Sequence, residues 1–224
     1  MCGRFTLHHT TRETLERFSV DQSIVDLEPR YNIAPSQAVA VVLQRQQRTL
    51  EAFKWGLIPF WARDPKIGNR MINARSETVA QKTAYKTPLK YRRCLIPSSG
   101  FYEWNKQGDV RVPIYIYLKD ARPLALAGLW EEWHAPSGET LQSCTIITTR
   151  ANHFMSSIHH RMPVVFTPKQ EEIWLDPSVQ NPNQLLLLLQ PYPDRDMTAH
   201  PVSRQMNVPA FDEPSCIEPL EEEN

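Results

Sequence analysis

The second residue of the chain carries the most reactive chemistry of the sequence. Cys2 follows Met1, and cysteine is small enough to follow an initiator methionine that is removed. We therefore expect a mature chain that begins with a free amine and a thiol, whose reference pKa values are about 7.7–8.0 and about 8.5. The amine can condense with an aldehyde to an imine, on which the thiolate closes to a thiazolidine. It can also act as the base for its own side chain, as in N-terminal nucleophile hydrolases.

Three further segments place polar side chains inside apolar, strand-like stretches. Asn73 offers donors and acceptors that suit the positioning of an amine and a carbonyl. Glu103 is flanked by aromatic residues, and burial there would raise its pKa and let it transfer protons. One imidazole of His159 and His160 could act as acid or base near pH 7. Each residue also has an ordinary alternative: a cysteine without a role at position 2, a turn asparagine, an exposed glutamate and loop histidines.

Cations and aromatic residues accompany these segments. Arg4 alternates onto the face of Cys2, where it could hold a phosphate or lower the thiol pKa, and Arg75 alternates onto the face of Asn73. Aromatic side chains beside cations suit single-stranded nucleic acid, through stacking and phosphate contacts. Surface arginines and core tryptophans are the alternatives. Two clusters place aromatic residues beside cations in the sequence. One has Trp55, Phe60 and Trp61 before Arg63 and Lys66, and the other has Phe101, Tyr102 and Trp104 after Lys90, Arg92 and Arg93.

Composition is that of a soluble globular protein, with 41% hydrophobic and 22% charged residues in 224. No apolar run approaches the length of a membrane span, and no signal peptide opens the chain, so we expect a cytoplasmic protein, nucleoid-associated when it binds DNA. The absence of a Cys-x-x-Cys pair argues against a structural zinc site. The absence of a glycine-rich phosphate loop argues against a nucleotide cofactor.

The net charge of zero hides an uneven distribution. The chain has 25 basic and 25 acidic residues, and residues 211–224 hold six of the acids and no Lys or Arg. Residues 1–210 therefore carry 25 basic against 25 − 6 = 19 acidic groups, a net charge of +6. We expect a mildly basic body that is compatible with a polyanionic partner, followed by a solvated acidic tail.

Short strands must position these residues. Alternating hydrophobicity and turn signals predict an α+β fold with a mainly antiparallel sheet or barrel-like core and a few flanking helices. We expect a single β-rich domain over residues 1–210, followed by the tail 211–224. Capping signals predict helices that begin near Thr10, Thr167 and Asn181, and a fourth helix is predicted over 76–85. The predicted strands cover 38–43, 50–55, 100–105, 112–118, 124–133 and 141–149.

Eight ordered motifs resemble those of the SRAP family, the SOS-response-associated peptidases or abasic-site-processing proteins. They run from residue 1 to about residue 207 without a departure at the motif positions. The motifs are MCGRF (1–5), RYNIAP (30–35), WGLIP (55–59), INARSET (72–78), RCLIP (93–97), GFYEW (100–104), IHHRMP (158–163) and HPVS (200–203).

The resemblance implies an enzyme that binds abasic sites in single-stranded DNA and links to them covalently through Cys2. The Cys2 amine would attack C1′ of the ring-opened sugar in lyase-like Schiff-base chemistry, and the thiolate would then close a thiazolidine that shields the lesion from strand cleavage. Asn73 would position the amine, Glu103 would move protons, and His159 would assist ring opening and reversal. The implied protein is a monomer without metal or cofactor. Its implied DNA contacts are Arg4, Arg75, Arg161 and Trp104.

Two other classes of function stay open. The family name records a peptidase that removes its own leader with Cys2 as nucleophile; only Met1 precedes Cys2 here, so self-processing is possible but not required. A non-covalent reader of modified bases in duplex DNA is the other class, and for such a reader Cys2 would be dispensable.

Overall fold

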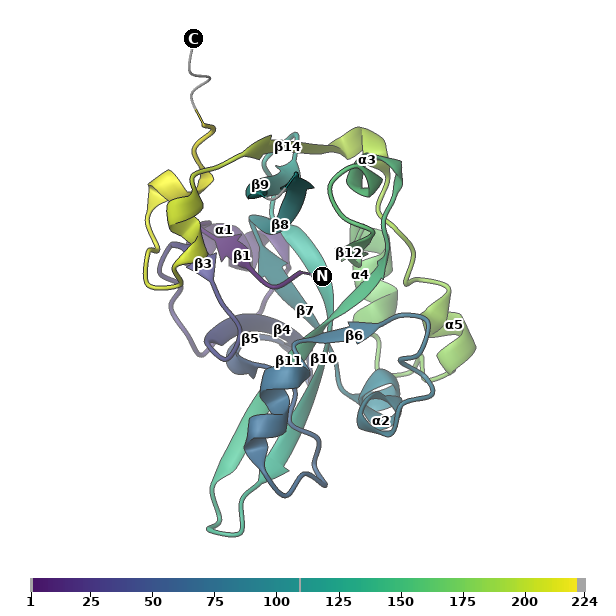
Figure 1. Ribbon diagram of the computed structural model, residues 1–224. Coiled ribbons are helices and arrows are strands. Elements are labelled where there is room, and N and C mark those ends of the chain that lie inside the picture. Colours follow the sequence, from purple (N-terminus) through teal and green to yellow (C-terminus); the bar gives the residue numbers. More distant parts are fainter. Residues whose placement is uncertain (1, 109, 221–224) are drawn as a thin grey trace.

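Two sheets form the framework of residues 2–108 and 110–220, the part of the chain that the computed structural model describes (Figure 1). The first sheet has five strands in the order β14-β9-β8-β1-β3, and all of its pairings are antiparallel. Phe5 pairs with Phe101, so the residues just before β1 come beside the middle of β8. The strands are β1 (Phe5–Leu7), β3 (Arg30–Ile33), β8 (Gly100–Gln107), β9 (Val110–Leu118) and β14 (Met197–Pro201).

The second sheet closes on itself. Its path runs β12-β11-β10-β7-β4-β5-β2, and β11 also pairs with β5, so β11, β10, β7, β4 and β5 form a ring. Closure leaves these strands without a free edge, which is the defining property of a barrel. The strands are β2 (Gln22–Ser23), β4 (Ala38–Gln44), β5 (Arg48–Trp55), β6 (Asn73–Arg75), β7 (Arg93–Ser98), β10 (Leu124–His134), β11 (Thr140–Arg150), β12 (Arg161–Pro163) and β13 (Val165–Phe166).

The helices are short and lie around the sheets, with α2, α4 and α5 gathered on one side of the barrel (Figure 1). None of the helices within the described residues is long and apolar enough to cross a membrane. The α-helices are α1 (Thr11–Arg17), α2 (Thr83–Tyr91), α3 (His153–Ser156), α4 (Pro168–Leu175) and α5 (Pro182–Leu186), and the 3-10 helices are η1 (Pro65–Arg70), η2 (Asp194–Asp196), η3 (Arg204–Asn207) and η4 (Pro214–Ile217).

Trp55, at the end of β5, links the barrel core to the chain that carries Asn73. Its ring meets Phe5 edge-on at 5.1 Å, and its indole N–H donates to the carbonyl of Ile72 at 2.9 Å. Gly56 follows with φ +132°, and a Cβ there would lie 2.6 Å from the carbonyl oxygen of Gly68. Only glycine tolerates both the conformation and this close approach. The WGLIP motif therefore fixes the path of the segment that leads into β6.

The predicted fold class is confirmed, and all six predicted strands are present as β4, β5, β8, β9, β10 and β11. Helices α1, α4 and α5 begin one residue after the predicted signals, and Thr10 forms the predicted capping box with Glu13. The fourth helix was wrongly placed, because residues 76–82 are turns and bends and α2 begins at Thr83. Long-range contacts hold this segment: Val79 is fully buried and Glu77 pairs with Arg161.

The described part of the acidic C-terminal segment packs against the first sheet. Asp212 accepts hydrogen bonds from the backbone N–H groups of Tyr31 and Asn32 at 2.5 and 2.8 Å and forms an ion pair with Arg30. Cys216 is fully buried in a small cluster with Tyr102 and other apolar side chains. Residues 211–220 are therefore part of the fold instead of the expected solvated tail, and residues 221–224 lie outside the described residues.

Candidate active site

Cys2 lies at the start of the first sheet, beside the strand that carries Glu103. The N–H of Tyr102 donates to the carbonyl of Arg4 at 3.0 Å, which fixes the first residues of the chain along β8. The Cys2 side chain is fully buried, and its Sγ lies 3.9 Å from the Arg4 carbonyl oxygen. Burial, and secondly the carboxylate of Glu103, raise the pKa of the Cys2 thiol well above its usual range. The thiol therefore needs a nearby base before it can act as a nucleophile.

Asn73 reaches the same place from the barrel. It is the first residue of β6, which runs parallel to β11 with Asn73 opposite Ile146. Its Nδ2 donates to the Cys2 carbonyl oxygen at 2.8 Å. Its Oδ1 is buried and accepts no hydrogen bond from any residue that the structure describes. A buried amide oxygen beside the first peptide unit of the mature chain is a ready acceptor for an amine N–H.

Glu103 and His159 complete a group of polar side chains at this point, which we call the reacting cluster: Cys2, Asn73, Glu103 and His159. Glu103 is only 2% exposed, and burial raises its pKa above the ordinary carboxylate value. His159 places its Nδ1 3.9 Å from a Glu103 oxygen, and burial lowers the pKa of this imidazole. Both shifts favour the neutral forms, which suits groups that exchange protons near neutral pH.

The loop before β12 sets which histidine faces Glu103. The N–H of Arg161 lies 3.0 Å from Nδ1 of His159, and the Arg161 carbonyl lies 3.1 Å from the same nitrogen. An unprotonated Nδ1 can accept a hydrogen bond from the Arg161 N–H, and a protonated Nδ1 can donate to the Arg161 carbonyl. The backbone of Arg161 therefore holds the ring in either protonation state. His160 is exposed, and its ring packs against that of His159 with centroids 4.3 Å apart and the planes tilted by 31°. His159 is therefore the less exposed of the two histidines and lies 3.9 Å from Glu103, while the charge of Glu103 also acts on His160.

Arg4 does not face this cluster or solvent. Its Nη1 donates to Asn32 Oδ1 at 2.6 Å and to the Met206 carbonyl at 2.8 Å. Asn32 in turn donates through Nδ2 to the carbonyls of Met206, Val208 and Phe211 at 2.9, 3.0 and 2.6 Å. With Asp212 on the backbone of residues 31 and 32, these contacts bind the C-terminal segment to β1 and β3. We call Arg4, Asn32 and Asp212 the C-terminal clamp.

The other predicted DNA contacts differ in how accessible they are. Arg75 is exposed at the end of β6. Arg161 is buried and binds Glu77 through both terminal nitrogens. Trp104 is partly buried, and its indole N–H donates to Asn207 Oδ1 at 2.8 Å. Only Arg75 among the predicted arginines presents its guanidinium to solvent.

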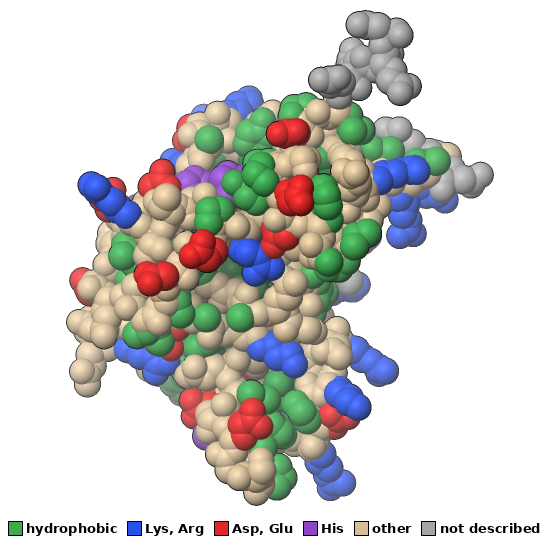
Figure 2. Space-filling view, turned by 90° about the vertical axis from the view of Figure 1, so that its left-hand side faces the viewer, with side chains coloured by type: hydrophobic (Ala, Val, Ile, Leu, Met, Phe, Trp, Pro, Cys, Tyr) green, Lys and Arg blue, Asp and Glu red, His purple; other side chains and the backbone are tan. Residues whose placement is uncertain are grey.

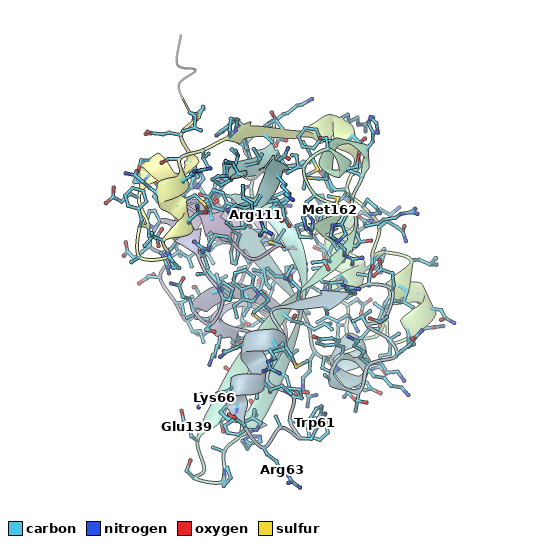
Figure 3. All side chains as sticks on the ribbon, viewed as in Figure 1. Trp61, Arg63, Lys66, Arg111, Glu139 and Met162 are labelled. Atoms are coloured by element: carbon cyan, nitrogen blue, oxygen red, sulfur yellow. The ribbon has the colours of Figure 1, made fainter. Side chains whose placement is uncertain are left out.

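The surface of the molecule has a hollow with cations on both sides (Figure 2). The outline of the molecule is indented between the upper body and a lower lobe, with Lys and Arg side chains on either side (Figure 2). Arg111 lies in the upper part of the molecule, and Trp61, Arg63 and Lys66 lie in the lower part, near Glu139 of the β10–β11 hairpin (Figure 3). Trp61 is 47% exposed, and residues 61–70 line a groove of about 440 Å³.

Sequence reasoning missed Asn32, Glu77 and Asp212. Asn32 lies inside the RYNIAP motif and Glu77 inside INARSET, so the motifs marked both positions without indicating a partner. Asp212 stands in the stretch predicted to be a solvated tail. No group of three or more His, Cys, Asp or Glu side chains that could hold a metal ion is found within the residues that the structure describes.

Comparison with known proteins defines the class to which this arrangement belongs. The family model of the SOS response associated peptidases (SRAP) matches residues 1–209, so the chain belongs to this family. The abasic site processing protein YoqW of Bacillus subtilis (strain 168) is 44% identical over 97% of this chain and 99% of its own length. The abasic site processing protein HMCES of Gallus gallus is 33% identical over 86% of this chain and 67% of its own.

A solved structure agrees with these relatives. The crystal structure of a protein from Bacteroides thetaiotaomicron superposes with a TM-score of 0.90 at 28% identity, over 98% of this chain and 100% of that one. The similarity therefore spans nearly the whole chain.

Proposed function

We propose that this chain processes abasic sites in single-stranded DNA by forming a covalent thiazolidine through Cys2 once Met1 has been removed. The relatives that it matches over most of its length are named abasic site processing proteins. The observation that carries the proposal is the contact of Asn73 Nδ2 with the Cys2 carbonyl at 2.8 Å, in a cluster that also holds Glu103 and His159. An amine, a thiol, an amide acceptor and two proton carriers are what aldehyde capture requires.

The first bond forms between the Cys2 amine and C1′ of the ring-opened deoxyribose. The abasic sugar is a hemiacetal in equilibrium with an aldehyde, and proton transfer to its ring oxygen opens it. His159 and Glu103 are the groups that deliver and withdraw protons during this step. The amide oxygen of Asn73 accepts one amine N–H, which directs the nitrogen lone pair to the carbon. Addition followed by loss of one water gives the Schiff base.

The second bond forms between Sγ of Cys2 and the same carbon. Because burial holds the thiol pKa high, the proton must be taken by a base inside the site, and Glu103 is the nearest carboxylate of the reacting cluster. The proton ends on the former imine nitrogen, and a five-membered ring results without any oxidation or reduction. Reversal follows the same path backwards: one water hydrolyses the imine, and His159 takes back the proton of the sugar hydroxyl as the ring closes.

The DNA strand would follow the surface hollow, because cations and an exposed aromatic side chain lie beside it. Arg75 is exposed beside Asn73, and the lower side of the hollow offers Trp61, Arg63 and Lys66. Phosphates would contact these cations, and an unstacked base could lie on the exposed indole of Trp61. We expect the protein to act as a monomer, because the reacting cluster is assembled from one chain.

A denaturing gel of the protein mixed with an abasic single-stranded oligonucleotide tests the proposal. Wild type should give a heat-stable shifted band, and Cys2→Ala should lose it while it keeps much of the non-covalent binding. Blocking the amine with one extra N-terminal residue should also abolish the band, although the thiol remains. An unchanged band in either variant would exclude this chemistry. A non-covalent reader of bases would give no heat-stable band with any variant.

A further inference from the structure

The guanidinium of Arg161 bonds to Thr148 of the barrel strand β11 and to the carboxylate of Glu77. Its Nη2 donates to the Thr148 carbonyl at 2.7 Å and lies 3.2 Å from Thr148 Oγ1. Its Nη1 and Nη2 donate to the two carboxylate oxygens of Glu77 at 2.7 and 3.1 Å. An arginine binds a phosphate in the same bidentate way, with two N–H donors of its guanidinium. Glu77 therefore occupies these nitrogens.

Glu77 is well placed to be displaced. Its side chain is 51% exposed, whereas that of Arg161 is 10% exposed, so the carboxylate is the solvent side of the pair. The hydrogen bonds from Arg161 lower the pKa of Glu77, which stays ionised at neutral pH. Thr148 lies opposite Arg75 in the pairing of β6 with β11, so the exposed Arg75 belongs to the same corner of the barrel. Arg161 also follows His159 by two residues, which puts this corner next to the reacting cluster.

We propose that Glu77 is an internal stand-in for a DNA backbone phosphate, which the phosphate next to the lesion displaces from Arg161 during binding. The inference rests on the proposed function, since it requires a DNA strand to pass this corner. The exposed carboxylate can leave this ion pair, and the arginine stays in place because the Thr148 carbonyl still holds it. Glu77 thus lowers the affinity for single-stranded DNA below the value that the cations alone would give. The affinity is lowest for a strand that places no phosphate next to Arg161.

The test uses the full-length chain and an unmodified oligo-dT, with binding measured by fluorescence anisotropy at low salt. Glu77→Gln should tighten binding about fivefold, the effect of removing about 1 kcal/mol of competition. Glu28→Gln, an exposed carboxylate in the loop between β2 and β3, makes the same change in net charge and is the matched control. Arg161→Gln should weaken binding, and in that background Glu77→Gln should have no larger effect than Glu28→Gln.

Each result decides the inference. A Glu77→Gln variant that binds no tighter than Glu28→Gln, or that gains as much without Arg161, overturns it. A weaker-binding Glu77→Gln also overturns it, because Glu77 would then be holding Arg161 in its binding position. If the abasic adduct forms but Glu77→Gln has no effect, the inference alone fails. If Glu77→Gln tightens binding but no adduct forms with abasic DNA, the proposed function alone fails. Absence of oligo-dT binding by wild type and Glu77→Gln alike contradicts both.

Discussion

Two buried polar clusters lie within a few residues of each other at the N-terminus, and they are built differently. In the C-terminal clamp, Arg4, Asn32 and Asp212 bond to backbone carbonyl and N–H groups of segments far apart in the sequence. In the reacting cluster, His159 lies beside Glu103 and Asn73 bonds the Cys2 carbonyl. Burial shifts the pKa of Cys2, Glu103 and His159, and Asn73 keeps a buried acceptor open among the described residues. Bonding to main-chain groups of distant segments indicates support, and titratable side chains that lie close to one another indicate chemistry.

The largest expected effect separates Glu103 from another buried glutamate. Glu103→Gln removes the proton carrier, so the rate of adduct formation should fall about 10²–10⁴-fold. Glu131 on β10 is the matched control, since it is 1% exposed and burial raises its pKa as well. Glu131→Gln should leave the rate unchanged. Rapid-quench samples on denaturing gels measure both variants, and equal losses would mean that Glu103 acts through the fold alone.

The two asparagines should divide between rate and stability. Asn73→Ala misplaces the amine and should slow adduct formation about 10²-fold with little effect on unfolding. Asn32→Ala leaves several buried carbonyls and the Arg4 guanidinium without their partner, and should lower the free energy of unfolding by about 2–3 kcal/mol. Urea denaturation measures the second effect and the adduct rate of the folded protein the first. If Asn32→Ala slows the reaction as much as Asn73→Ala, the clamp belongs to the chemistry.

Two arginines should differ in the salt dependence of binding. Arg75→Gln removes an exposed phosphate contact, so the slope of log affinity for single-stranded DNA against log salt should decrease by about 0.7. Arg4→Gln should lower stability and leave this slope unchanged, since Arg4 is bonded to Asn32 and Met206. A loss of slope in Arg4→Gln would show that the clamp opens to bind DNA.

The smallest expected effect concerns stability against pH. Burial raises the pKa of Glu103, so between the unfolded and folded pKa values the folded chain holds more protons than the unfolded chain. Stability from this group is therefore highest below the unfolded pKa, about 4.3, and declines as pH rises through the folded pKa. Glu103→Gln should melt at a higher temperature than wild type at pH 7, and the difference should vanish near pH 4. Calorimetry at both pH values checks the sign.

The sequence was sufficient for features that depend on neighbouring residues. Alternation predicted β4, β5 and β8 to β11, the capping box at Thr10 marked α1, and the aromatic flanks of Glu103 indicated its burial. The motif positions also identified Asn73 and His159, which the structure brings to Cys2 and Glu103 respectively.

Features that depend on distant partners were not predictable from the sequence. Arg4 alternates with Cys2 along the chain, yet its partners are Asn32 and Met206, and no local pattern indicates them. Residues 211–220 are acidic and proline-containing, which resembles a solvated tail, but Asp212 is bonded to β3 across about 180 residues. The predicted helix over 76–85 failed for the same reason, because the contact of Glu77 with Arg161 outweighs local helix propensity.

The central claim is that the amine and the thiol of Cys2 both bond to the same sugar carbon. Tandem mass spectrometry of the purified, nuclease-trimmed adduct tests it most directly. We expect a mass equal to the Met1-less chain plus the abasic nucleotide that remains after trimming, minus one water, and an N-terminal thiazolidine that borohydride does not reduce. A linkage through sulfur alone, through a lysine, or through a borohydride-reducible imine at Cys2 would contradict it.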